Sequence, residues 1–171
     1  MTKDGIRLRC GKSISVDQEA LIDKVLSNLI AAQTEIKLAM ALDTGGQVIS
    51  FKGERSSIDL VGLGALVAAD LAASQEIAKM ADVYQENQVI IRQGSKMNTI
   101  IHEVGREMIL MAMISSSVPL GWFNYLVRQA ARQIDGILQM SLHKAEDIVV
   151  LSSPNSLVDD FSAALDDIWK G

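Results

Sequence analysis

IDLVGLGALVAADLAAS, from Ile58 to Ser74, is typical of a helix that has almost no polar face. Its bulky residues follow the i, i+3, i+4 spacing of a single core-facing stripe, formed by Leu60, Leu63, Val67 and Leu71. The opposite side carries small, apolar residues: Gly62, Ala65, Ala69, Ala72 and Ala73. A helix that is apolar all round must be covered on both sides. We therefore expect one side to pack on its own sheet and the other, with Glu76 just beyond, to contact another protein surface.

The composition indicates one globular domain with a short extension. The chain has 171 residues, of which 49% are hydrophobic and 22% charged, as expected for a folded core and not for disorder. Its net charge of −5 argues against broad electrostatic binding to nucleic acid or to an anionic membrane. The sequence has no signal-peptide pattern at its start and no uninterrupted apolar run of about 18 residues. We expect no membrane insertion and a cytoplasmic location.

Hydrophobic periodicity predicts an α+β fold. The helical segments are expected over residues 17–32, from Ser56 or Ser57 to about Met80, and from Pro119 to about Met140. The expected strands are Glu35–Asp43, Gln47–Phe51, Val89–Arg92, Met97–Val104 and Met108–Ile114. Tight turns between neighbouring strands, such as Gly45-Gly46, predict an antiparallel sheet. In the first strand the pattern predicts one buried face, formed by Ile36, Leu38, Met40 and Leu42.

The two ends of the chain are expected to differ from the central domain, residues 17–141. Residues 1–16 contain the alternation Ile6, Leu8 and Cys10, which indicates an N-terminal arm or edge strand. Residues 142–155 are interpreted as a connector, and residues 156–171 as an acidic amphipathic helix. Its apolar stripe consists of Leu157, Phe161, Leu165, Ile168 and Trp169. This helix either packs on its own domain or docks in a partner's groove, and the long connector favours the second alternative.

The sequence shows no catalytic or metal-binding constellation. Cys10 is the single cysteine, so it excludes an internal disulfide, and it has no base near it in the sequence. His102 and His143 are about forty residues apart, and we expect His102 on the surface of its strand. Gly11-Lys12-Ser13 resembles the end of a phosphate-binding loop but lacks the required earlier glycine. We therefore predict no catalytic residue, no metal and no cofactor.

Over residues 17–141 the chain resembles the roadblock/dynein-light-chain family. The matching segments are Gln47–Ser50 in the first hairpin, Ile58–Ala73 as the central helix, and Ser117–Trp122 at the start of the last helix. The resemblance implies a profilin-like fold: a five-stranded antiparallel sheet with the first and last helices on one face and the central helix on the other. It also implies a homodimer in which central helices pack together and third strands pair edge to edge. The third-strand residues are Val89, Ile90, Ile91 and Arg92.

Within the family the chain is most similar to the bacterial gliding-polarity GTPase-activating proteins, whose C-terminal segment resembles the acidic tail from Asp159 to Ile168. This implies a partner of a small Ras-like GTPase in cell polarity, motility or related signalling. Such a partner promotes GTP hydrolysis by remodelling the GTPase and has no active site of its own. The alternative is a scaffold that holds a GTPase or signalling protein without altering hydrolysis; an enzyme with its own active site ranks last.

Overall fold

The computed structural model describes residues 6–8, 13–54 and 58–140. In chain order the elements are β1 (Ile6–Arg7), β2 (Ser13–Ile14), α1 (Val16–Ala32), β3 (Ile36–Asp43), β4 (Val48–Gly53), α2 (Leu60–Met80), β5 (Val89–Gln93), β6 (Met97–Val104), β7 (Met108–Ser115) and α3 (Leu120–Gln139). The predicted strands and the outer helices are confirmed to within a few residues at their ends.

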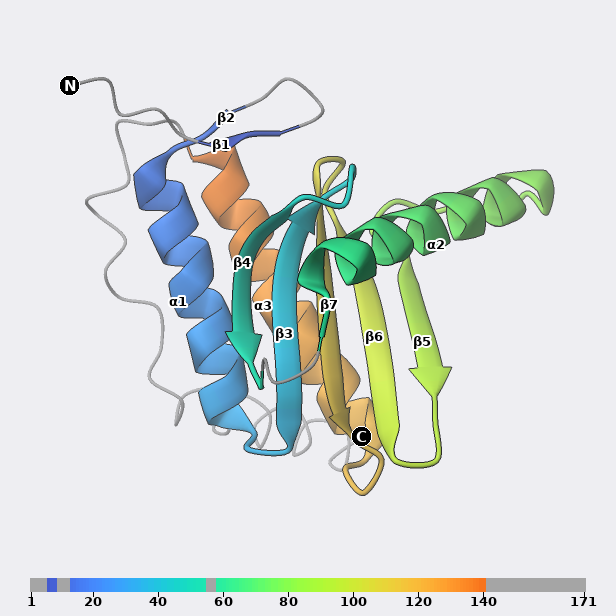
Figure 1. Cartoon of the computed structure of the whole chain (residues 1–171). Helices are drawn as coiled ribbons and strands as arrows, with labels where there is room; N and C mark the ends of the chain where they lie inside the picture. Colours follow the sequence, from blue (N-terminus) through green and yellow to red (C-terminus); the bar gives the residue numbers. More distant parts are fainter. Residues whose placement is uncertain (1–5, 9–12, 55–57, 141–171) are drawn as a thin grey trace, which may run out of the picture.

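The main sheet is antiparallel, with strand order β4-β3-β7-β6-β5. Helices α1 and α3 pack side by side on one face, and α2 crosses the other face (Figure 1). The α+β class and the placement of the three helices are therefore confirmed. Because β4 and β5 lie at the ends of the strand order, they are the two edges of the sheet.

Each face of the sheet carries its own hydrophobic core. The core under α1 and α3 centres on Phe123 and Leu26, and the smaller core under α2 contains Val67 and Leu71. β3 contributes to both cores, so the prediction of a half-buried strand was wrong. Its residues on the α2 side are Leu38, Met40 and Leu42, and those on the α1/α3 side are Ile36, Ala39 and Ala41.

Ile36 changes sides because of an irregularity in the strand. The pairing of β3 with β7 shifts register between Ile36 and Leu38. A register shift moves a side chain to the opposite face of the sheet, which simple alternation cannot anticipate.

α2 begins later than predicted, at Leu60 and not at Ser56 or Ser57. The Asp59 carboxylate accepts hydrogen bonds from the backbone amides of Val61 (3.2 Å) and Gly62 (3.1 Å). It therefore satisfies two of the amides that a helix start leaves without partners. The residues at 55–57 lie outside the described part of the chain.

His102 is buried, in contrast to the predicted surface position. It lies on β6 beneath α3, and its Nδ1 is 2.6 Å from the carbonyl oxygen of Glu103. Burial lowers the pKa of the imidazole, and the nearby Arg128 and Arg132 of α3 lower it further. β6 is the second strand from the edge of the sheet. Helix α3 covers His102 there, which the sequence pattern did not predict.

The N-terminal residues form a small separate ribbon. β1 pairs with β2 and not with the main sheet, while Leu8 and Ile14 are buried in the α1/α3 core. The rest of the expected arm, and the predicted connector and acidic helix, lie outside the described residues. The proposed domain boundaries stay a prediction.

Candidate partner-binding surface

The outward side of α2 is apolar over most of its length, with Glu76 and Lys79 as charged side chains toward its C-terminal end. Its large side chains Val61, Leu66, Ile77 and Met80 are 78%, 70%, 67% and 88% exposed. The alanines that lie exposed between them are Ala65, Ala69, Ala72 and Ala73. At about 100° per residue these eight residues share one half of the helix circumference. We call them the α2 face; exposed apolar patches of this kind are typical of protein interaction sites.

The inward side of α2 fixes the helix to the sheet. Val67 and Leu71 are buried in the smaller core. Gly64 allows a close approach, because a Cβ there would collide with the carbonyl oxygen of Gly46 in the β3–β4 turn. Gly46 has a φ of +88°, which favours glycine on its own account. Gly64 therefore sets how closely α2 approaches the β3–β4 turn.

Polar contacts of α2 point toward the sheet edge and leave the outer face uncharged over most of its length. Asp70 forms two hydrogen bonds with Arg92 of β5, from Nη2 to Oδ1 (2.5 Å) and from Nε to Oδ2 (3.3 Å). This carboxylate raises the pKa of the Arg92 guanidinium. One turn further on, Gln75 Nε2 donates to Oε1 of the buried Glu103 on β6 (2.6 Å). Both contacts orient α2 so that its apolar half faces away from the sheet.

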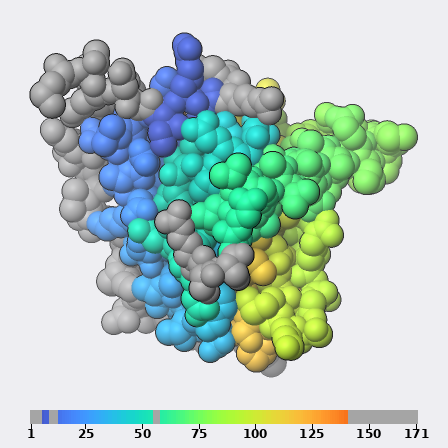
Figure 2. Space-filling view, in the orientation of Figure 1, coloured from blue at the N-terminus to red at the C-terminus, as the bar shows by residue number. Residues whose placement is uncertain are grey.

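The C-terminal part of α2 extends beyond β5. Figure 1 shows the helix crossing the sheet and continuing past its edge, and Figure 2 shows this end standing out from the body of the domain. The helix closes at Asp82, which has a φ of 55°, with a hydrogen bond from Val83 N to Ala78 O (2.9 Å). Val83 and Tyr84 follow as further exposed apolar side chains. Exposed apolar side chains therefore continue beyond the end of α2 into residues 83–84.

β5 gives the same side of the molecule an unpaired strand edge. Within the described part of the chain it pairs only with β6. Ile91 is exposed, and Val89 and Ile90 are partly buried. An edge strand offers a row of backbone donors and acceptors to another chain. The predicted edge position of Val89–Arg92 is confirmed, while its pairing with a second chain stays a prediction.

Most of the α2 residues predicted for a contact do lie on the outer side. Ala65, Ala69, Ala72, Ala73 and Glu76 are exposed, whereas Gly62 is half-buried beside the Asp59 cap. The Nζ atom of Lys79 forms a salt bridge with Oε1 of Glu76 (2.6 Å) and lies over the ring of Tyr84.

Sequence reasoning missed the large members of the α2 face. When the spacing of the core stripe is applied to the whole helix, Leu66, Ile77 and Met80 do not fall on it. The sequence therefore contained a signal that these side chains lie on the outer side. The five apolar residues predicted for a contact in the C-terminal segment lie outside the described residues.

The described residues hold no group of three or more His, Cys, Asp or Glu side chains that could bind a metal. α2 is long and apolar enough to cross a membrane by length and composition alone. Its inner side, however, is tied to the sheet by Val67, Leu71 and the Asp70–Arg92 pair. The chemistry on this side of the molecule is that of a contact surface.

Comparisons with solved structures show that the chain has the roadblock fold. A roadblock/LC7 domain from Streptomyces avermitilis aligns with a TM-score of 0.62 and 13% identity, over 69% of this chain and 98% of that one. MglB from Myxococcus xanthus aligns with a TM-score of 0.68 and 21% identity, over 83% of this chain and 100% of that one. An MglB with a tetrameric arrangement aligns with a TM-score of 0.61 and 25% identity, over 69% and 90%. No protein-family model and no curated protein sequence matches the chain.

Proposed function

We propose that this chain is a homodimeric regulator of a small Ras-like GTPase, located in the cytoplasm and acting in cell polarity, motility or related signalling. The observation that carries the proposal is that, among the described residues, nothing covers the α2 face or pairs with the outer edge of β5 beside it. The similarity to MglB structures, one of them described as tetrameric, supports an assembly of several chains. The family resemblance supplies the GTPase as the partner class.

The geometry of the α2 face and of the β5 edge supports a dimer. Two α2 helices can approach closely because alanines separate the large side chains of each α2 face. Two β5 strands can pair at the same time, so that one sheet runs through both subunits. Apolar burial contributes about 25 cal/mol per Å². An interface of ordinary size, about 1,200–2,000 Å² in total, can therefore offset the cost of association.

The GTPase would bind across the paired α2 helices. Glu76 and Lys79 offer charges near the end of α2, and the apolar residues past the sheet edge offer further contact area. Such a surface accelerates hydrolysis by favouring the GTPase conformation in which its own loops orient water and phosphate. The proposed activity therefore assigns no catalytic residue to this chain.

The alternative is a scaffold that binds the GTPase through the same surface and leaves hydrolysis unchanged. GTP turnover by a small Ras-like GTPase from the same organism, measured with and without this chain, separates the two functions. An activator raises the rate of GTP turnover, whereas a scaffold binds the GTPase and leaves that rate unchanged. Absence of both binding and stimulation would contradict the proposed function.

The variant for this assay is Ala72→Arg, which places a long charged side chain in the α2 face. Its matched control is Ala20→Arg, because Ala20 is an exposed helical alanine on α1, away from this surface. We expect Ala72→Arg to abolish GTPase binding and Ala20→Arg to leave it intact. Because α2 also serves the dimer, mass and GTPase binding are measured on the same sample. Normal binding by a dimeric Ala72→Arg protein would remove this helix from the GTPase site.

A further inference from the structure

A groove lies between α1 and α3, on the side of the molecule away from α2. It has a volume of about 300 Å³. Its apolar lining comes from both helices and consists of Leu21, Val25, Ile137 and Met140. A smaller hollow continues it along the same two helices, past Leu29 and Leu126. The two helices thus leave an elongated apolar depression on the outer side of α1 and α3.

Gly136 keeps the groove open. It lies in the interior of α3, where glycine weakens a helix relative to alanine. A Cβ built at this position meets no atom within 4 Å. The glycine is therefore not required by packing inside the domain, and it leaves room for an incoming side chain.

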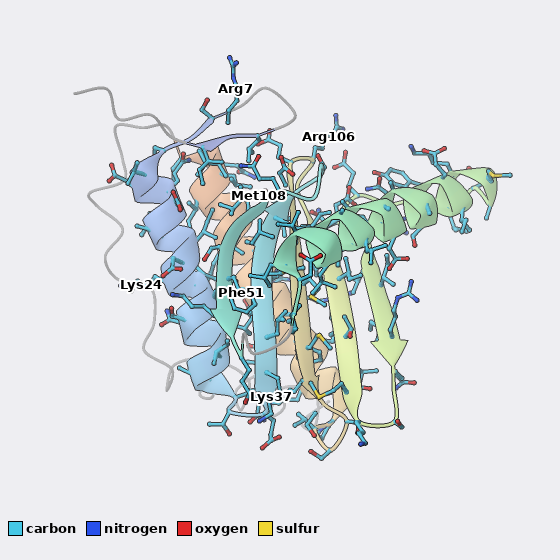
Figure 3. All side chains as sticks on the ribbon, viewed as in Figure 1. Arg7, Lys24, Lys37, Phe51, Arg106 and Met108 are labelled. Atoms are coloured by element: carbon cyan, nitrogen blue, oxygen red, sulfur yellow. The ribbon has the colours of Figure 1, made fainter. Side chains whose placement is uncertain are left out.

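The rim of the groove is basic. Lys24 on α1, labelled in Figure 3, and Arg132 on α3 both line it and are exposed. Among the described residues neither of them has a salt-bridge partner, although the chain as a whole carries a net charge of −5. An apolar floor with unpaired cations at its edge fits an acidic amphipathic helix.

The chain itself contains a segment of this chemistry. Residues 156–171 combine the apolar stripe from Leu157 to Trp169 with four aspartates, at 159, 160, 166 and 167. The chain leaves α3 next to Met140, which lines the groove. Residues 141–155 can span up to about 50 Å, whereas a helix of the length of α3 measures about 30 Å. The segment can therefore reach any part of the groove, and its attachment to the same chain raises its effective concentration there.

We propose that the groove between α1 and α3 is the docking site of the chain's own C-terminal segment, residues 156–171. Phe161 and Trp169 supply the large apolar anchors, and the aspartates lie toward Lys24 and Arg132. A segment held there is not available to another protein. The inference does not depend on the proposed GTPase function.

Fluorescence of Trp169 tests this docking in the full chain. Trp122 is replaced by Phe, so that Trp169 is the remaining tryptophan, and quenching by neutral acrylamide reports its accessibility. In this background Gly136→Leu fills the groove, while Gly121→Leu is the matched control. Gly121 lies on the same helix, also has open space around its Cβ position, and does not line the groove. Circular dichroism verifies that both variants are folded.

We expect Trp169 to be shielded in the background protein and in Gly121→Leu, and quenched at least twofold more strongly in Gly136→Leu. Lys24→Glu should increase the quenching in the same direction, because it removes a cation from the rim. Equal and strong quenching in all proteins would overturn the proposal, since the segment would then be undocked. Shielding that survives Gly136→Leu, or that is lost on dilution, would place the segment elsewhere or on a second copy, and would also overturn it.

Discussion

The two faces of the sheet are covered by helices to different extents. Among the described residues, the core under α1 and α3 contains 24 buried apolar side chains and the core under α2 contains 9, so the second face is far less deeply covered. α3 presents polar residues such as Arg128 and Gln139 to solvent, as an outer helix normally does. α2 presents Leu66, Ile77 and Met80. The α1/α3 face is therefore covered within the domain, whereas the α2 face leaves large apolar side chains exposed.

The largest expected effect is on the free energy of unfolding, and it should distinguish a core residue from a contact residue. Phe123 is fully buried on the α1/α3 face, so Phe123→Ala should lower the free energy of unfolding by about 3–5 kcal/mol. Leu66→Ala on the α2 face should cost less, and its cost should depend on protein concentration because it acts through association. Urea denaturation at several concentrations measures both. An equally large, concentration-independent loss for Leu66→Ala would identify Leu66 as a core residue.

A charge on the α2 face should break the dimer and leave the domain folded. Ala69→Arg buries an unpaired cation at the proposed interface, where it costs several kcal/mol. We expect light scattering to give the monomer mass for Ala69→Arg and the dimer mass for Ala20→Arg. Circular dichroism should be native for both. If Ala69→Arg remains dimeric, the central helices do not form the interface.

Much of this architecture could be predicted from the sequence, because it follows from local periodicity. The inner stripe of α2, with Val67 and Leu71, is a property of one short segment, whereas the edge position of β5 was implied by the resemblance to roadblock domains. The resemblance to roadblock domains added the distribution of helices over the two faces.

The features that could not be predicted depend on tertiary context. The register shift that turns Ile36 to the other face arises from pairing with β7, which is distant in sequence. His102 is buried because α3 returns over β6. Leu66 and Ile77 are different, because their outward position follows from the spacing of α2 alone: both fall outside the inner stripe that contains Val67 and Leu71. The α1/α3 groove exists only once both helices are placed.

The Asp70–Arg92 pair should contribute a smaller, salt-dependent effect. Asp70→Asn removes the charge that links α2 to β5, so we expect a small fall in Tm at low salt. The fall should shrink at high salt, since exposed ion pairs are screened. The exposed pair of Arg106 with Glu86 (2.6 Å) provides a control, Arg106→Gln, that leaves the α2–β5 link intact. Amide hydrogen exchange in β5 checks the link between the two elements. If exchange in β5 accelerates in Arg106→Gln but not in Asp70→Asn, the Asp70–Arg92 pair does not hold β5 to α2.

The smallest effect concerns pH. Burial holds the pKa of His102 below its usual value of about 6.5 in the folded protein. The unfolded chain therefore takes up the proton first, and stability should fall as pH drops from about 6.5 toward the lower folded pKa. His102→Asn should flatten this part of the stability profile, measured by urea denaturation between pH 7 and 5. An unchanged slope in the variant would show that His102 is not the titrating group.

The mass of the full chain in solution tests the central claim most directly. One chain has a mass of 18.5 kDa. If the α2 face and the β5 edge are covered by a second copy, light scattering at micromolar concentration should give twice that mass or a larger multiple, and Ala69→Arg should return it to the mass of one chain. A parent protein that has the mass of a single chain under these conditions would contradict the account.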